Sequence, residues 1–192
     1  MLGGGVAYLP ISVHEDEWLV HADDAVDLAI HRWVSEDSEN HEIGYLNLNG
    51  VVANFGRSTF FREGETVAFT GLMPNFAGEM TNLLALRVGT LALVTDELIA
   101  GERGTNPANY HVIDAQSYPG NSGAPVWLVV ARSFDLIGVL VAGLPTKAAL
   151  AMRSEPTRHR EEYYNLGMTL VTPVERIADI LNCQEEKRRR GG

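Results

Sequence analysis

The part of the sequence best suited to chemistry is residues 118–126 (YPGNSGAPV), in which Ser122 stands between two glycines. A serine that attacks an acyl carbon needs backbone N–H groups aimed at the oxygen that becomes negatively charged. Glycine allows the unusual backbone dihedral angles that bring such donors together. The pattern therefore predicts an acyl-transfer nucleophile, with the Gly120 and Ser122 amides as the oxyanion-binding pair. A hairpin rich in glycine and proline, whose serine only caps a turn, is the alternative.

Short strands, broken by Gly, Pro, Asn and Asp, are the elements that must position this serine. Alternating or continuous apolar residues predict strands at 26–30, 65–72, 83–95, 110–115, 124–131, 136–144 and 166–171. The 83–95 segment is long enough for a buried helix, but its β-forming residues favour a strand with a bulge at Gly89. Polar residues predict connections at 35–42, 100–109 and 146–162, the last with room for a short helical turn.

A single helix is predicted near the C-terminus. Thr172 suits the N-cap, Pro173 suits the first helical position, and Glu175 follows three residues after the cap. One apolar face is formed by Val174, Ile177, Ala178 and Leu181. The helix should end near Asn182, before a charged tail at 184–192. Strands followed by one late helix predict an all-β barrel or sandwich with a C-terminal helix.

Residues 120–125 (GNSGAP) resemble the nucleophile motif of the chymotrypsin-like, or trypsin-like, serine peptidases. That motif is usually Gly-Asp/Asn-Ser-Gly-Gly-Pro, and Ala124 is the only departure from it. Other blocks are similar to bacterial members of the family, in the same order. Residues 26–30 (VDLAI) resemble the segment with the catalytic aspartate, 64–71 the strand that opens the second barrel, and 136–143 the strand along the substrate pocket. The resemblance spans roughly residues 18–182.

The resemblance implies an all-β fold of two β-barrels with the active site between them. Residues 1–55 would be the remnant of a first barrel, 56–172 the second barrel, 173–183 the C-terminal helix and 184–192 the tail. Ser122 would attack a peptide carbonyl, and Asp27 would orient a histidine that acts as the general base.

The resemblance also implies which residues line the substrate pocket. These are Gln116, Ala142 and Gly143. An acidic residue at the base of the pocket selects Lys or Arg in trypsin-like members, and Gln116 is neutral. A trypsin-like preference is therefore not implied, although Asp114 lies close by in the sequence.

No histidine stands where the family places its general base. His14 and His21 precede Asp27, but His14 lies in an acidic stretch typical of a surface turn, and His21 is close to Asp27 on the same segment. The remaining histidines, His31, His41, His111 and His159, follow the aspartate, against the chain order of the family. We therefore expect that the first strands of the first barrel are missing and that the chain has little peptidase activity. A pseudopeptidase that binds peptides or a protein partner without cutting them is the alternative.

Composition narrows the function classes further. The chain has 192 residues, a formal net charge of −10 and one cysteine, Cys183. The acidic balance argues against nucleic acid as a partner, and a lone cysteine excludes an internal disulfide. No apolar stretch approaches the ~20 residues that span a bilayer, so no membrane partner is expected.

The remaining expectations concern ligands and location. Acidic residues at 15–17 and 23–24 lack the spacing of a calcium loop and indicate a solvated face. No metal and no cofactor are implied, because the chemistry needs only side chains and water. The expected partner is a peptide or protein substrate. No signal peptide is visible, which makes the cytoplasm the default location.

Overall fold

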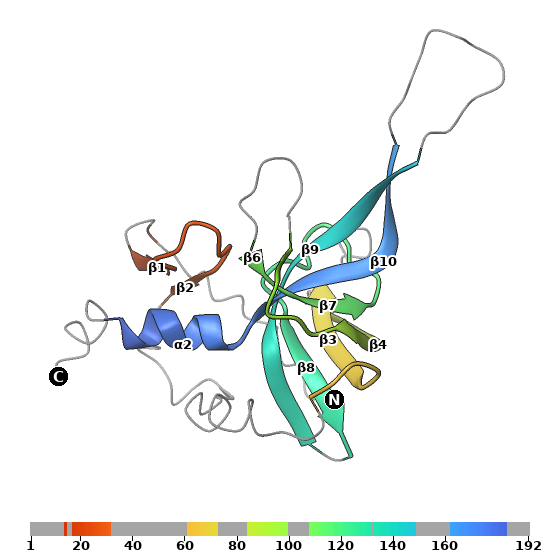
Figure 1. The fold of residues 1–192 in the computed structure, drawn as a ribbon, viewed down its shortest axis with the longest axis horizontal. Helices are drawn as coiled ribbons and strands as arrows, with labels where there is room; N and C mark the ends of the chain where they lie inside the picture. The colour runs from red at the N-terminus through yellow and green to blue at the C-terminus, as the bar shows by residue number, and fades with distance from the viewer. Residues whose placement is uncertain are drawn as a thin grey trace, which may run out of the picture.

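The fold is built around one closed β-barrel (Figure 1). A computed structural model describes residues 14, 17–31, 61–72, 84–99, 108–131, 133–148 and 162–183. Six antiparallel strands close the barrel in the order β10-β7-β4-β3-β8-β9. Their bounds are Thr66–Leu72 (β3), Leu84–Leu93 (β4), His111–Asp114 (β7), Pro125–Val130 (β8), Ser133–Ala148 (β9) and Glu162–Pro173 (β10).

These strands and one late helix confirm that the chain is mostly β, with a barrel and a short C-terminal helix. The described residues do not show a second barrel, so the two-barrel arrangement stays a prediction, as do the domain boundaries that depend on it. None of the helices in the described part of the chain is long and apolar enough to cross a membrane.

Two small sheets and the helix lie outside the barrel. β1 (Trp18–Val20) pairs with β2 (Ala29–His31), and β5 (Leu98–Ile99) pairs with β6 (Ala108–Asn109). The helix, α2, covers Glu175–Asn182. Figure 1 shows the β1–β2 hairpin beside α2, and both belong to one apolar cluster.

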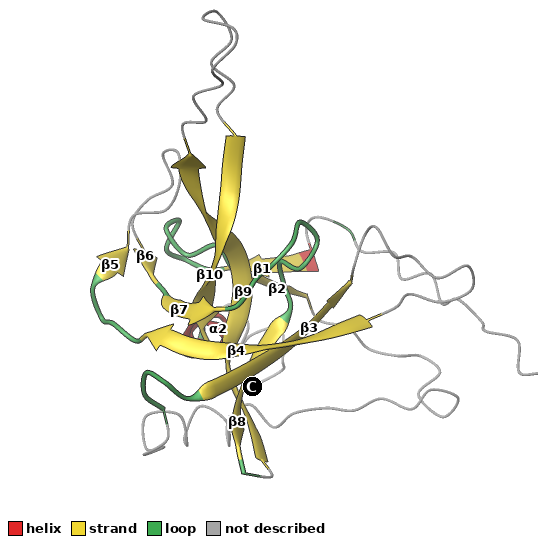
Figure 2. Cartoon of the chain, turned by 90° about the vertical axis from the view of Figure 1, so that its right-hand side faces the viewer, coloured by secondary structure: helices red, strands yellow, loops and turns green. Residues whose placement is uncertain are grey.

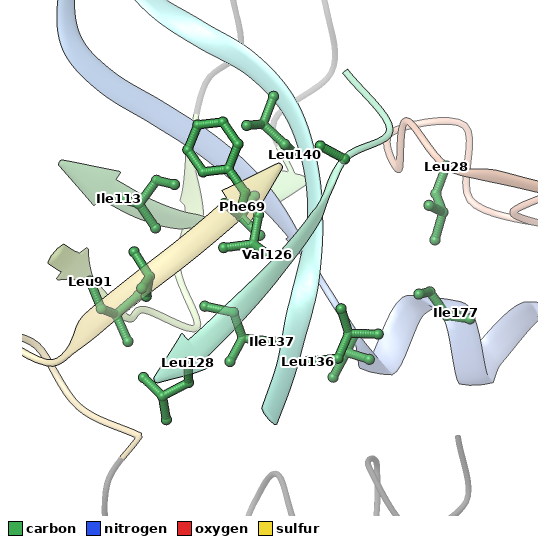
Figure 3. Packing of buried hydrophobic residues seen from close by; sticks show 14 of the residues in the cluster. Leu28, Phe69, Leu91, Ile113, Val126, Leu128, Leu136, Ile137, Leu140 and Ile177 are labelled. Carbon is green, nitrogen blue, oxygen red and sulfur yellow. The ribbon is translucent and has the colours of Figure 1, made fainter. Parts of the chain in front are cut away.

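The core runs from the barrel interior to this helix. Phe69, Leu91 and Ile113 are fully buried inside the barrel. Figure 3 shows Leu28, from the β1–β2 hairpin, facing Ile177 of α2 at the other end of the same cluster. The N-terminal hairpin is therefore attached to the barrel through apolar packing against the C-terminal helix.

β4 confirms the strand predicted at 83–95, but a bulge at Gly89 was wrong. Gly89 pairs regularly with Val67 of β3, and the irregularity in β4 lies between Leu91 and Leu93. The glycine is needed for another reason, because a Cβ atom here would lie 2.5 Å from the Cβ atom of Ala115. Close approach of β7 to β4, and not a bulge, excludes a side chain at Gly89.

The predicted helix start was wrong by two residues. β10 continues through Thr172 and Pro173, which pair with Val139 and Gly138 of β9. The N-cap is Val174, and no side chain caps the first turn. The helix ends at Asn182 as expected, and its buried residues are Ile177 and Ile180. Sheet pairing therefore takes precedence over the local capping signal.

β9 and β10 are longer than the sequence indicates. β9 continues to Ala148 and β10 begins at Glu162, so the predicted polar connection at 146–162 partly belongs to the strands. Figures 1 and 2 show this pair projecting beyond the barrel as a two-stranded arm. The predicted strand at 26–30 is shorter, because Leu28 donates to the Val26 carbonyl at 2.9 Å and β2 begins after that turn. The loop predicted at 35–42, most of that at 100–109 and the tail at 184–192 lie outside the described residues.

Candidate functional site

Ser122 lies in the loop that connects β7 to β8. Two turns shape this loop: the Asn121 N–H donates to the Tyr118 carbonyl at 3.0 Å, and the Ala124 N–H donates to the Asn121 carbonyl at 3.1 Å. Gly120 and Gly123 have φ values of 94° and 86°, in the left-handed region that favours glycine. Glycines on both sides therefore allow the sharp bend that exposes Ser122.

Two hydrogen bonds tie this loop to β9. The Gly123 N–H donates to the Leu140 carbonyl at 2.8 Å, and the Leu140 N–H donates to the Ala124 carbonyl at 2.9 Å. Together they fix the residue after the serine against the strand that the resemblance assigns to the substrate pocket.

A β-bulge in β9 brings a backbone carbonyl to the serine. Leu140 pairs with Val171 and Ala142 pairs with Leu170, so Val141 is the extra residue between two consecutive partners. The Val141 carbonyl accepts a hydrogen bond from the Ser122 hydroxyl at 2.7 Å. The hydroxyl of this candidate nucleophile therefore donates its hydrogen bond to the backbone of β9.

The amides of the loop divide into used and unused donors. Those of Asn121, Gly123 and Ala124 donate within the loop or to β9. Among the described residues, the Gly120 and Ser122 amides have no acceptor. These are the two donors predicted for the oxyanion, and both remain available for a ligand, which is the condition that the prediction requires.

Buried polar contacts that the sequence alone does not reveal hold the loop in place. The Asn121 side chain is only 1% exposed, and its Oδ1 accepts the Tyr118 N–H at 2.9 Å. On β10, the buried Thr169 hydroxyl donates to the Ala115 carbonyl at 2.8 Å and lies 2.9 Å from the Ser117 hydroxyl. These buried polar contacts fix the chain just before the serine.

Asp27 lies on the N-terminal hairpin and is exposed. Burial and, to a lesser extent, the Asp27 carboxylate raise the pKa of Tyr110. Tyr110 belongs to a small apolar cluster against which both Ala25 and Val141 pack. Asp27 and Val141, which accepts the hydrogen bond of the Ser122 hydroxyl, therefore adjoin the same cluster, although no hydrogen bond joins Asp27 to Ser122.

None of the four described histidines is hydrogen-bonded to Ser122, and three of them have side-chain contacts elsewhere. His14 lies in an exposed turn whose backbone N–H donates to the Glu17 carboxylate at 3.2 Å. His31 Nε2 lies 3.1 Å from the same carboxylate. His21 Nδ1 accepts the Asp23 N–H at 3.0 Å, and its Nε2 faces Asp179 of α2 at 3.5 Å.

The fourth, His111, is buried in β7 and lies edge-on to Phe61, with ring centroids 5.0 Å apart. Burial lowers its pKa to about 4. None of these four histidines contacts Ser122, whose hydroxyl donates to Val141. His41 and His159 lie outside the described residues.

The three predicted pocket residues lie around Thr169. Gly143 pairs with Thr169 across the β9–β10 ladder, and Ala142 is its exposed neighbour. Gln116 is exposed and follows Ala115, whose carbonyl Thr169 holds. Gly143 and the segment before Gln116 therefore lie next to Thr169, on its β9 side and its β7 side. Asp114, the acidic neighbour of Gln116, pairs with Met168 of β10 and is exposed.

The acidic groups of the N-terminal region do not form a metal centre in the part of the chain that the structure describes. Glu17 contacts His14 and His31, and Asp23 caps the Ala25 N–H at 3.0 Å. Glu15 and Asp16 lie outside the described residues.

Comparison with known proteins found no family model and no curated protein sequence that matches the chain.

Proposed function

We propose that this chain is a serine peptidase domain of the chymotrypsin-like type, with Ser122 as its nucleophile. The observation that carries the proposal is the loop around Ser122. Its hydroxyl is exposed beside two amides that have no acceptor among the described residues, and the loop is tied to β9 on its C-terminal side. Oxyanion stabilisation by preorganised amides is a large contribution to acyl-transfer catalysis.

The proposed reaction is an acyl transfer. The Ser122 Oγ atom gives up its hydrogen bond to Val141, attacks the substrate carbonyl carbon and transfers its proton to a base. The Gly120 and Ser122 amides bind the oxygen that becomes negatively charged. The tetrahedral intermediate then expels the amine, and water hydrolyses the acyl-enzyme. Asp27 would orient the base.

The rate of acylation should be low, because no described histidine is placed to act as the base for Ser122. None of the four described histidines is hydrogen-bonded to Ser122, whose hydroxyl donates to Val141. Serine without an adjacent base is a weak nucleophile at neutral pH. We therefore expect slow acylation, with the oxyanion-binding amides supplying most of the remaining acceleration.

A fluorophosphonate probe tests this proposal. The Ser122 oxygen would form a bond to phosphorus as fluoride leaves and the proton goes to solvent. Slow labelling is expected at Ser122, absent in Ser122→Ala and unchanged in Ser133→Ala. Ser133 is a matched control because its exposed hydroxyl also donates to a backbone carbonyl, that of Val130 at 3.1 Å. No labelling of Ser122 under conditions that label a reference serine peptidase would contradict the proposal.

A second candidate function rests on the hydrogen bond from Ser122 to Val141. A hydroxyl that donates to the backbone and lacks a histidine contact among the described residues suits a pseudopeptidase that binds peptides without cutting them. Fluorescent casein peptides distinguish the two functions. Binding that is unchanged in Ser122→Ala, with no cleaved product after prolonged incubation, would favour the pseudopeptidase. Product that disappears in Ser122→Ala would favour the peptidase.

A further inference from the structure

The Arg87 side chain, on β4, contacts the segment that precedes Ser122. It pairs with Phe69 of β3, which is fully buried in the barrel, so both side chains start from the interior face of the sheet. From there the Arg87 Nη1 atom donates to the Gln116 carbonyl at 3.2 Å. The guanidinium carbon lies 4.4 Å from the centre of the Tyr118 ring. One side chain thus holds two alternate residues of the serine loop.

The charge of Arg87 has no acidic partner in the described part of the chain. Its Nε atom is buried without a hydrogen-bond partner there. The contacts that compensate the half-buried cation are therefore the Gln116 carbonyl and the face of the Tyr118 ring. A guanidinium is attracted both by a carbonyl oxygen and by the face of an aromatic ring, so these two contacts hold the exposed residues Gln116 and Tyr118 to β4.

The fixed segment leads directly to the oxyanion donors. The Tyr118 carbonyl accepts the Asn121 N–H, and its own N–H donates to the Asn121 side chain. Gly120 lies inside this turn, so its amide is aimed by the position of Tyr118. A shift of Tyr118 would therefore move the Gly120 donor without touching the Ser122 hydroxyl, which is held by β9.

We propose that Arg87 is a positioning residue for the oxyanion-binding amides, acting through Gln116 and Tyr118. This inference rests on the proposed function of Ser122. It predicts that Arg87 affects how fast the serine reacts rather than how tightly a ligand binds or how stable the barrel is, since misplaced donors cost transition-state stabilisation.

The test measures the maximal rate of fluorophosphonate labelling (kinact), the probe concentration that gives half of this rate (KI), and the melting temperature. Arg87→Met removes the charge and the donors but keeps an unbranched side chain. It should lower kinact about tenfold, with KI and the melting temperature little changed. Arg87→Lys keeps the charge and one donor, and it should restore part of the rate. Arg176→Met is the control, because Arg176 is bound to Asp179 on α2 and should leave kinact at the wild-type value.

Tyr118 provides a second pair of variants that leaves Arg87 in place. Tyr118→Phe keeps the ring face and should label at the wild-type rate, whereas Tyr118→Leu removes it and should label more slowly. This pair also tests the inference if Arg87→Met does not fold. A wild-type kinact in Arg87→Met or in Tyr118→Leu would overturn the inference, as would a parallel loss of kinact and melting temperature in both.

The amide signals separate failure of the inference from failure of the proposed function. If wild-type protein is not labelled at all, the peptidase proposal fails, and NMR still reports on Arg87. The Gly120 amide signal should shift in Arg87→Met and stay in place in Arg176→Met. An unchanged Gly120 signal in Arg87→Met would show that Arg87 does not position this donor.

Discussion

The side-chain amide of Asn121 lies directly against Gly71 of β3, so closely that the glycine has no room for a methyl group. A Cβ atom built on Gly71 would lie 2.9 Å from the Asn121 Cγ atom and closer still to its Nδ2 atom. Gly71 pairs with Ala85, which places this contact at the end of the β3–β4 hairpin that adjoins the serine loop. The residue before Ser122 therefore packs against a glycine that is distant in the sequence.

Gly71→Ala should displace the Asn121 side chain from its position against β3. Because Asn121 is only 1% exposed and its Oδ1 holds the Tyr118 N–H, its side chain has little freedom to move away. We expect a loss of about 1–3 kcal/mol in the free energy of unfolding, typical of overpacking, and slower labelling of Ser122. Urea denaturation of Gly71→Ala, Asn121→Ala and the double variant checks the cause. The double variant should be less destabilised than the sum of the two single changes, and simple additivity would contradict the steric explanation.

Two buried threonines of β10 should differ in how much stability they lose when the hydroxyl is removed. Thr169 donates to the Ala115 carbonyl, whereas the hydroxyl of Thr172 is buried without a partner among the described residues. Thr169→Val should cost about 1–3 kcal/mol, because it leaves a buried carbonyl unsatisfied. Thr172→Val, its matched control, should be neutral or slightly stabilising. Equal destabilisation of the two variants in thermal or urea unfolding would show that the hydrogen bond of Thr169 does not contribute to the free energy of unfolding.

His111 should make the fold sensitive to acid. Burial lowers its pKa in the folded state to about 4, from an ordinary value of 6.5. The unfolded chain therefore binds this proton first as the pH falls, and stability decreases between pH 6.5 and pH 4. The shift corresponds to about 3 kcal/mol, complete below the folded-state pKa.

The pH dependence is checked by comparing unfolding free energies at pH 7.5 and pH 4. His111→Gln should lose less stability over this interval than the wild type, while the carboxylates titrate similarly in both proteins. His14→Gln is the control, because His14 is exposed and should keep the wild-type slope. The same slope in His111→Gln and wild type would exclude His111 as the source.

Features that depend on local pattern could be predicted from the sequence. The β-strands of the barrel follow from apolar runs and β-forming residues, and β3 and β7 lie within one residue of the expected bounds. The glycines around Ser122 predict a bend, and their positive φ values agree. These signals are local because each residue's own conformational preference produces them.

Features that depend on distant partners could not be predicted. Thr172 and Pro173 look like a helix start, but their pairing with β9 keeps them in a strand. Gly89 looks like a bulge, but β7 approaches it too closely for a side chain. Arg87 belongs to no motif, and the serine motif gives no reason for burying Asn121. The contacts of these two residues with Gly71, Gln116 and Tyr118 exist only once the barrel closes.

The inserted residue Val141 binds the Ser122 hydroxyl but takes no part in the pairing of β9 with β10. The β9–β10 ladder runs from Glu162–Ala148 to Pro173–Gly138, and the residue between the pairs Leu140–Val171 and Ala142–Leu170 takes no part in it. A lineage that lost this single codon would keep a regular ladder and a closed barrel, yet leave the Ser122 hydroxyl without its acceptor. The barrel can therefore be kept without the residue that binds the Ser122 hydroxyl.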